Sequence, residues 1–142
     1  MSEKEIKNYL EENDNIIFAI FFGSYVQNNS VYYNDIDIGI YTKKSLSLLE
    51  LGEIIAHLEI MTEKKIDIVE LNNLYRKSPL LAYNIISNCK IIFVRDTSVF
   101  NQFKKLTFLF YFDTQRLIEE GRKSLLKRIG NNAFGRRKCL KD

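Results

Sequence analysis

Seven consecutive apolar residues, Ile16–Phe22, constrain the fold more than any other feature of the sequence. The run is rich in β-branched and aromatic side chains, follows the turn-forming residues 13–15 and ends at Gly23. Its length is that of a strand, whereas a helix would normally need ten residues or more. A continuous apolar run of this kind is typical of a buried strand. We therefore predict that residues 16–22 form one.

The remaining apolar pattern predicts a small sheet with flanking helices. Residues 35–41 alternate between apolar and other side chains, which is the period of a strand, whereas residues 46–61 repeat apolar side chains at helical spacing. The predicted strands are 16–22, 35–41, 66–71 and 91–94, and the predicted helices are 3–12, 46–61, 79–87 and 97–129. This order indicates an α/β or α+β domain with a long C-terminal helix. The pattern does not decide whether the sheet is parallel, mixed or antiparallel.

Local signals mark the ends of several helices. Ser2 with Glu5 three residues later is a capping-box pattern, and Ser78 before Pro79 is a capping residue followed by proline at the first helical position. Asp96 is predicted to cap the last helix. Of the two late glycines in this region, Gly121 is expected to bend that helix and Gly130 to stop it.

The length of 142 residues fits one domain, which we assign to residues 1–130, followed by a basic and flexible tail over residues 131–142. No apolar run approaches the ~20 residues of a membrane span, and the charged start lacks the layout of a signal peptide. Two distant cysteines, without a CxxC pair or clustered histidines, argue against a zinc site or a disulfide framework. We therefore predict a cytoplasmic protein.

Charge is distributed unevenly along the chain. Residues 1–99 carry 10 basic and 14 acidic side chains, whereas residues 100–142 carry 11 basic and 4 acidic ones. The basic third either faces an acidic partner or nucleic acid, or is a solvated helix face with a loose tail. The aromatic residues of 100–112 are either core packing or a partner interface. Because no nucleic-acid-binding module is recognisable, nucleic acid is the less favoured partner.

Gly23 and Ser24 directly follow the predicted buried strand. Glycine lets the backbone approach a ligand where any Cβ would collide, and the serine hydroxyl adds a donor. If a helical turn begins there, its free N–H groups favour an anionic group such as phosphate. A strand that ends in Gly-Ser is more often a plain turn, so this motif is weak by itself.

Asp35 and Asp37 occupy alternate positions of the second predicted strand, so their carboxylates project to the same face. Two like charges held this close repel each other unless a cation lies between them. Mg²⁺ suits such a site because it prefers oxygen ligands and accompanies phosphates. Gly39, next on that face, would keep the space above the sheet open. The alternative is a pair of exposed aspartates at a strand start.

Asp67 lies between isoleucines in the third predicted strand, which we expect to be an inner strand. A buried carboxylate is costly without a partner or a metal. Three carboxylates from two strands would suit a pair of metal ions that clamp a phosphoryl displacement. Asp67 could instead accept the proton of the attacking hydroxyl. The alternative is a surface carboxylate on an edge strand.

Taken together, these motifs resemble the signature of the nucleotidyltransferase superfamily. Gly23-Ser24 and Asp35-Ile36-Asp37 are separated by a ten-residue spacer, and a third aspartate, Asp67, follows on a later strand. The segment 65–72, the proline-bearing helix, the segment 91–96 and the long helix resemble the minimal nucleotidyltransferase (MNT) family. The likeness covers about residues 5–129. That family includes the antitoxins of HEPN/MNT toxin–antitoxin pairs.

The resemblance implies a nucleotidyltransferase fold with a small mixed sheet of about four strands. It implies a Mg²⁺-dependent antitoxin, with two metal ions expected, that transfers AMP from ATP to a tyrosine of a HEPN ribonuclease toxin and silences it in a complex. By motif, Gly23 and Ser24 would hold the triphosphate, and Asp35 and Asp37 would bind metal. Asp67 would complete the metal site and orient or deprotonate the acceptor hydroxyl.

One departure from the family pattern concerns phosphate binding. The family commonly has arginine directly after Gly-Ser, where this chain has Tyr25. Lys43, Lys44 and Arg95 are the candidates to replace its charge, with no order among them. Two rival functions remain open: a non-catalytic antitoxin that occludes its toxin, and a transferase that modifies a small molecule of the aminoglycoside kind.

Overall fold

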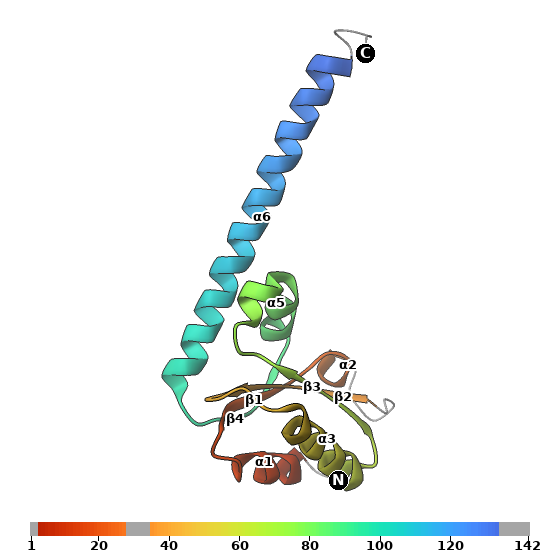
Figure 1. Cartoon of the computed structure of the whole chain (residues 1–142), viewed down its shortest axis with the longest axis vertical. Coiled ribbons are helices and arrows are strands. Elements are labelled where there is room, and N and C mark those ends of the chain that lie inside the picture. The colour runs from red at the N-terminus through yellow and green to blue at the C-terminus, as the bar shows by residue number, and fades with distance from the viewer. Residues whose placement is uncertain (1–2, 28–34, 134–142) are drawn as a thin grey trace.

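The computed structural model describes residues 3–27 and 35–133 and contains a four-stranded mixed sheet among them (Figure 1). The strands are β1 (Ile16–Phe22), β2 (Asp35–Thr42), β3 (Lys65–Glu70) and β4 (Lys90–Val94), in the order β3-β2-β1-β4. β1 is antiparallel to both β2 and β4, whereas β2 and β3 are parallel. The predicted α/β class and mixed sheet are confirmed.

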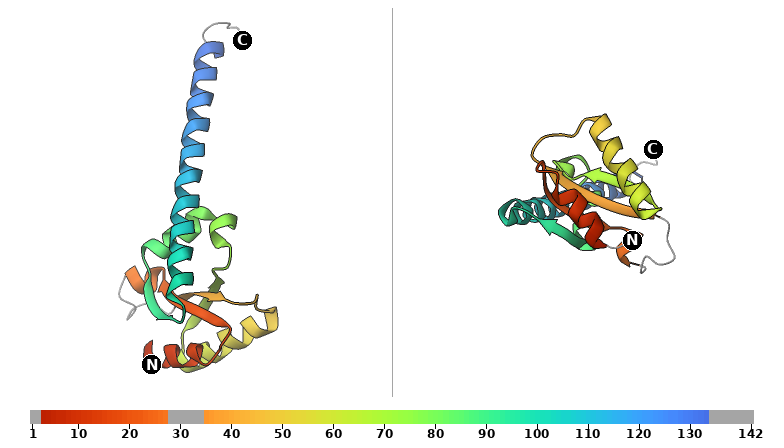
Figure 2. Two further views of the ribbon diagram at one scale, coloured as in Figure 1. Left: turned by 90° about the vertical axis from the view of Figure 1, so that its left-hand side faces the viewer. Right: turned by 90° about the horizontal axis from the view of Figure 1, so that it is seen from below.

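Helices cover both faces of this sheet. On one face lie α1 (Glu3–Glu11) and α3 (Leu48–Thr62). On the other lie α4 (Leu74–Lys77), α5 (Pro79–Ser87) and the first turns of α6 (Thr97–Ala133) (Figures 1 and 2). The short α2 (Ser24–Gln27) follows β1 directly. The result is a three-layer arrangement with the sheet in the middle.

Strand β1 occupies the centre because nearly every side chain in it is apolar. Ile16, Ala19 and Phe21 pack towards α1 and α3, whereas Phe18 and Ile20 pack towards α5 and α6, and all five are buried. Burial on both faces is the reason for the uninterrupted apolar run. The predicted strand is confirmed with the same bounds.

Helix ends follow the sequence signals only in part. Asp96 accepts backbone N–H bonds from Ser98 and Val99 and caps α6 as predicted. Ser78 occupies the N-cap position of α5 with Pro79 directly after it, as predicted, but its side chain makes no capping hydrogen bond. Its backbone lies outside the usual capping conformation. A capping box forms instead at α3 between Ser47 and Glu50. Ser2 lies outside the described residues.

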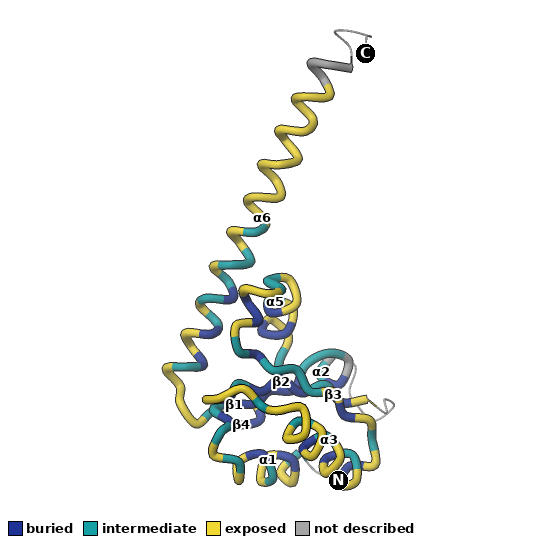
Figure 3. The backbone as a smooth tube through the Cα atoms, in the orientation of Figure 1, coloured by how far each residue is buried: buried dark blue, intermediate teal, exposed yellow. Residues whose placement is uncertain are grey.

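Helix α6 is longer than predicted and extends well beyond the sheet (Figure 1). It continues through both Gly121 and Gly130 to Ala133, so the predicted stop at Gly130 is wrong. Glycine weakens a helix interior by only about 1 kcal/mol and does not by itself end one. Residues 115–129 of α6 are exposed (Figure 3). Residues 134–142 of the predicted tail lie outside the described residues.

None of the helices in the described residues has an apolar stretch long enough to cross a bilayer.

Thr107 is a weak point where α6 meets the rest of the fold. The residue is fully buried, and its hydroxyl oxygen has no hydrogen-bond partner among the described residues. A buried hydroxyl without a partner costs about 1–3 kcal/mol, so Thr107→Val is expected to raise the free energy of unfolding by about 1 kcal/mol. Denaturant titration of both proteins measures this difference. A lower value for the variant would show that the hydroxyl is bonded.

Candidate active site

The sheet register brings the three predicted aspartates to one region. Asp37 in β2 is the direct partner of Asp67 in β3, and Asp35 is the partner of Lys65. Because alternate residues of a strand share a face, all four side chains project from the face that α4, α5 and α6 cover farther along the sheet. Asp35 and Asp67 are exposed, whereas Asp37 is half-buried.

Asp67 does not lie on an inner strand, so that part of the prediction is wrong. β3 is an edge strand of the sheet, and the Asp67 side chain is exposed. Its neighbours Ile66 and Ile68 supply the apolar contacts of β3 on the opposite face. The carboxylate therefore remains hydrated and needs no buried partner, while its register still places it beside Asp37.

Electrostatics confirms that these charges act on one another. Partial burial raises the pKa of the Asp37 carboxyl, and the nearby carboxylates of Asp67 and Asp35 raise it further. Lys65 acts in the opposite direction and lowers it. Two carboxylates and one ammonium group therefore act on the Asp37 carboxylate. A cation placed there would relieve the repulsion.

The described residues do not form a ready-made metal cage, because no three His, Cys, Asp or Glu side chains among them are placed to hold one ion. This arrangement still fits Mg²⁺, which is commonly bound by one or two carboxylates together with substrate phosphates. The aspartates of β2 and β3 would therefore supply only part of a coordination shell. Phosphate oxygens of a bound nucleotide would supply the rest.

The raised pKa of Asp37 gives a pH dependence that can be measured in metal-free buffer. The folded protein holds this proton to a higher pH than the unfolded chain does. The resulting stabilisation is complete below the ordinary value of 3.8 and is lost as the pH rises through the raised pKa. Asp37→Asn is expected to remove this part of the decline. Unfolding titrations at a series of pH values test it, and an unchanged slope in the variant would contradict it.

Gly23 is required where it stands for two reasons. Its φ of 73° is in the left-handed region that other residues adopt at a cost. A Cβ added there would collide with Oδ2 of Asp37 and lie 3.3 Å from Cγ. The backbone between β1 and α2 therefore passes directly over the carboxylate. The predicted helical turn is present, because α2 begins at Ser24. The contact of Gly23 with Asp37 places this turn beside the aspartates.

Gly39 does not keep the space above the sheet open, contrary to prediction. The residue is buried, and a Cβ there would lie 3.1–3.2 Å from the side chain of Leu71. The apolar Leu71 side chain fills the space because it belongs to the core beneath α4 and α5. The open part of this face is thereby confined to the end with Asp35 and Asp37.

Tyr25, which stands where the family commonly has arginine, is a core residue. Its ring packs against Phe21 with centroids 4.7 Å apart, and its hydroxyl donates a 2.7 Å hydrogen bond to Oε2 of Glu3. Lys90 donates a second 2.7 Å bond to Glu3. Tyr25 therefore anchors α2 to α1 through Glu3.

The three cations suggested as substitutes for that arginine lie at the wrong end of the sheet. Lys43 bonds through its backbone N–H to Asn15, just before β1, and Arg95 donates to the carbonyls of Ile16 and Glu11. Lys44 is bonded to Asn15 as well. Gly23 follows the other end of β1. The cation beside the carboxylates is Lys65, whose signal in the sequence is its position two residues before Asp67.

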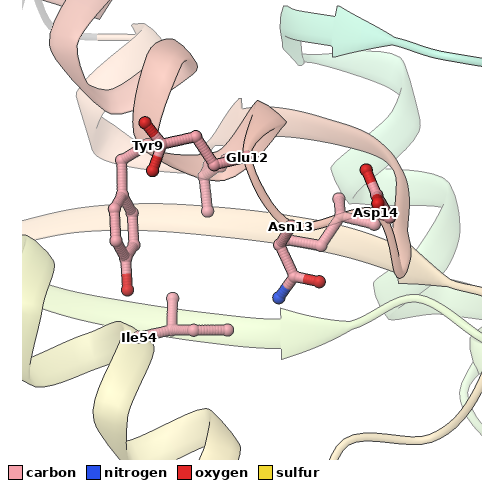
Figure 4. Close-up of a pocket in the computed structure, with 7 residues that line it drawn as sticks. Tyr9, Glu12, Asn13, Asp14 and Ile54 are labelled. Carbon is pink, nitrogen blue, oxygen red and sulfur yellow. The ribbon is translucent and has the colours of Figure 1, made fainter.

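The structure also contains a pocket of about 340 Å³ that is distant from the aspartates (Figure 4). It lies between α1, α3 and the start of β1, on the opposite face and at the opposite end of the sheet from Asp37. Tyr9 borders it and stacks on His57 with centroids 4.0 Å apart. His57 therefore has a structural role, as a ring that packs against Tyr9.

Comparison with known proteins identifies the class of this fold and site. Residues 4–98 match the model of the family described as "Polymerase beta, Nucleotidyltransferase". The chain therefore belongs to the polymerase beta nucleotidyltransferase family, and the predicted superfamily is confirmed. The match includes Gly23, Ser24 and all three aspartates. Comparison with curated proteins gives no significant match.

Several solved chains are similar in fold. A chain of a toxin–antitoxin crystal structure with AMP-PNP is 19% identical, with a TM-score of 0.68 over 91% of this chain and 98% of its own. A chain from the complex of a tri-AMPylated Shewanella oneidensis HEPN toxin with an MNT antitoxin is 16% identical, with a TM-score of 0.61 over 90% and 98%. A chain of the toxin–antitoxin MntA–HepT is 17% identical, with a TM-score of 0.62 over 89% of this chain and 95% of its own.

Proposed function

We propose that this protein is an MNT-type antitoxin that transfers AMP from ATP to a tyrosine of a cognate HEPN ribonuclease toxin. The observation that carries this proposal is the packing of Gly23 against Asp37, with Asp35 and Asp67 beside it, in a nucleotidyltransferase fold. Two similar folds support it: one is a toxin–antitoxin with AMP-PNP, and the other accompanies a tri-AMPylated HEPN toxin. We assign this activity to residues 1–130 and to the cytoplasm.

The nucleotide would bind where β1 ends. Gly23 has no side chain to keep a triphosphate from the backbone, and Ser24 follows it at the start of α2. Lys65 supplies the positive charge that the missing arginine would otherwise give. Because Lys65 lies in register with Asp35, it is placed to pair with phosphate oxygens at the same edge of the sheet.

Asp35, Asp37 and Asp67 would hold the Mg²⁺, with two ions expected. When bound, the metal supplies positive charge that offsets the charge of the phosphates. Without it, the carboxylates would repel one another and a triphosphate. Partial burial raises the pKa of Asp37, and repulsion from Asp67 and Asp35 raises it further. The exposure of Asp35 and Asp67 leaves them open to ligands from solvent.

Asp67 has a second role in this proposal. Its edge-strand position leaves it accessible to a tyrosine of another protein, and its carboxylate can orient the hydroxyl and accept its proton. The tyrosine oxygen then forms a bond to the α-phosphorus while the bond from that phosphorus to the bridging oxygen of pyrophosphate breaks. Pyrophosphate leaves, and AMP remains on the toxin.

Labelled ATP tests the proposed reaction directly. Purified protein, Mg²⁺ and the cognate toxin are incubated with ATP that carries the label on either the α- or the γ-phosphorus. The proposal predicts labelled toxin from the α-label alone. Label from the γ-position would indicate phosphoryl transfer, and an unlabelled toxin in a tight complex would favour occlusion. Label recovered only on an added small molecule would favour the third function.

Lys65→Gln tests the proposed triphosphate contact. Loss of one charge-assisted contact is expected to weaken ATP binding by roughly 10- to 100-fold, because such contacts contribute about 1.5–3 kcal/mol. Lys43→Gln is the matched control, since Lys43 lies at the far end of the sheet. Isothermal titration calorimetry with ATP and Mg²⁺ measures both. Equal affinities for the two variants would remove Lys65 from the site.

A further inference from the structure

Helix α6 has one apolar face that is covered in its first half and uncovered in its second. Phe100, Phe103 and Thr107 are buried on this face against the rest of the fold. Helical spacing continues the same face through Thr114, Ile118, Gly121, Leu125 and Ile129, which we call the α6 stripe. Ile118, Leu125 and Ile129 are 59%, 52% and 47% exposed. Leu117 and Leu126 flank the stripe and are exposed as well.

The uncovered segment needs a partner. Residues 111–133 extend roughly 34 Å at 1.5 Å per residue. The rings of Tyr111 and Phe112 contact Tyr83 of α5, and residues 115–129 are exposed (Figure 3). Most helices in proteins gain their stability by packing an apolar face, and the apolar side chains of this segment are exposed. The α6 stripe is therefore an interaction surface.

The charges around Gly121 indicate which partner fits. The segment reads Glu119-Glu120-Gly121-Arg122-Lys123, two acids before the glycine and two bases after it. Such a pattern is complementary to itself when the chain direction is reversed. Leu117 and Leu125 lie equally far on either side of Gly121, so one pair of leucines shares this centre. We propose that α6 pairs with α6 of a second copy of this chain, antiparallel, with the two helices crossing at Gly121.

The side chains agree with this geometry. A two-fold axis through such a pair places the same flank of both helices side by side. Glu119 and Arg122 lie on one flank of the stripe, so Glu119 comes within about one residue, or about 1.5 Å along the axis, of the level of the partner's Arg122, and Arg122 of the partner's Glu119. Within the described part of α6, the ion pairs inside the chain are those of Arg116 with Asp113 and Glu120. Glu119 and Arg122 are therefore available to a partner.

Gly121 allows a close crossing. A Cβ added at this position would have no atom within 4 Å. Glycine at the contact between two helices lets their backbones approach, so Ile118 and Leu125 of each copy can pack beside the crossing. This inference concerns assembly and does not depend on AMP transfer.

Sedimentation equilibrium of the full chain, without toxin, tests the pair. We expect a monomer–dimer equilibrium that Glu119→Arg and Arg122→Glu each weaken by roughly 10- to 30-fold, because two attractive contacts become repulsive. The double variant, with both substitutions, restores opposite charges and is expected to return to nearly the original affinity. Lys127→Glu, on the opposite side of the helix, is the control and should have little effect.

The alternatives give different results. A monomer at every concentration, a dimer that ignores the charge variants, or an equal loss with Lys127→Glu would each overturn the proposal. Protection of the α6 stripe from hydrogen exchange only after the toxin is added would also overturn the proposal, because the toxin would then be the partner that covers the stripe. Circular dichroism of each variant verifies that α6 remains helical. Failure of the dimer leaves the label-transfer experiment unaffected, so the two proposals are tested separately.

Discussion

Replacing Asp35 and Asp37 together by asparagine is expected to slow AMP transfer by about 10³-fold or more. The two carboxylates share one face at the open end of β2, next to Gly23, and would supply the protein's charge for the bound metal. Charge stabilisation of this kind contributes several kcal/mol to a transition state, and about 4 kcal/mol corresponds to 10³ in rate. Transfer of α-label from ATP to the toxin, measured over time, gives the ratio.

Stability distinguishes a lost site from a lost fold in that experiment. Partial burial raises the pKa of Asp37, and repulsion from the neighbouring carboxylates raises it further. Because the double variant removes both unfavourable effects, it is expected to be at least as stable as the original protein. Asp14→Asn, an exposed aspartate before β1, is the control and should transfer AMP normally. Undiminished transfer by the double variant would contradict the metal assignment.

Gly23→Ala is expected to lower the free energy of unfolding by roughly 2 kcal/mol and to abolish measurable ATP binding. The left-handed backbone alone costs about 1–2 kcal/mol for a residue with a Cβ. The added methyl group also collides with the Asp37 carboxylate, so this side chain must move and with it the proposed metal ligand. Thermal unfolding and calorimetry with ATP measure the two effects.

Gly52→Ala is the matched control for that substitution. Gly52 lies in the exposed part of α3, and a Cβ there would have no atom within 4 Å. Alanine in a helix is better than glycine by about 0.5–1 kcal/mol, so this variant is expected to be more stable and to bind ATP normally. Normal ATP binding by Gly23→Ala would show that the turn after β1 does not contact the nucleotide.

The bounds of β1 and β2 and the shared face of Asp35 and Asp37 could be predicted from the sequence because their signals are local. The apolar run of β1 and the alternation of Asp35 and Asp37 with isoleucines depend only on neighbours along the chain. These patterns placed both strands to within a residue. They also placed the two carboxylates on one face, as the sheet register confirms.

The order of strands has no such local signal, and the errors follow from that. Asp67 was expected on an inner strand because isoleucines flank it, yet β3 is at the edge and those isoleucines are covered on one face by α1 and α3. The cation beside the site was missed for the same reason. Only the parallel register of β2 and β3 shows that Lys65, and not Arg95, adjoins the aspartates.

Tyr25 and α6 show a second limit. The role of Tyr25 depends on Glu3, a residue 22 positions earlier, and no periodicity connects them. The prediction that Gly130 ends α6 is wrong because the helix continues through this residue to Ala133. One glycine costs too little to end a helix whose other residues favour it.

The most direct test of the proposed function is intact-mass spectrometry of the cognate toxin after co-expression with this protein. We predict that the toxin gains mass in steps of one AMP with the original protein and gains none with the Asp35→Asn, Asp37→Asn variant. An unmodified toxin that is nevertheless neutralised by the original protein would contradict AMP transfer, and the antitoxin would then act by binding alone.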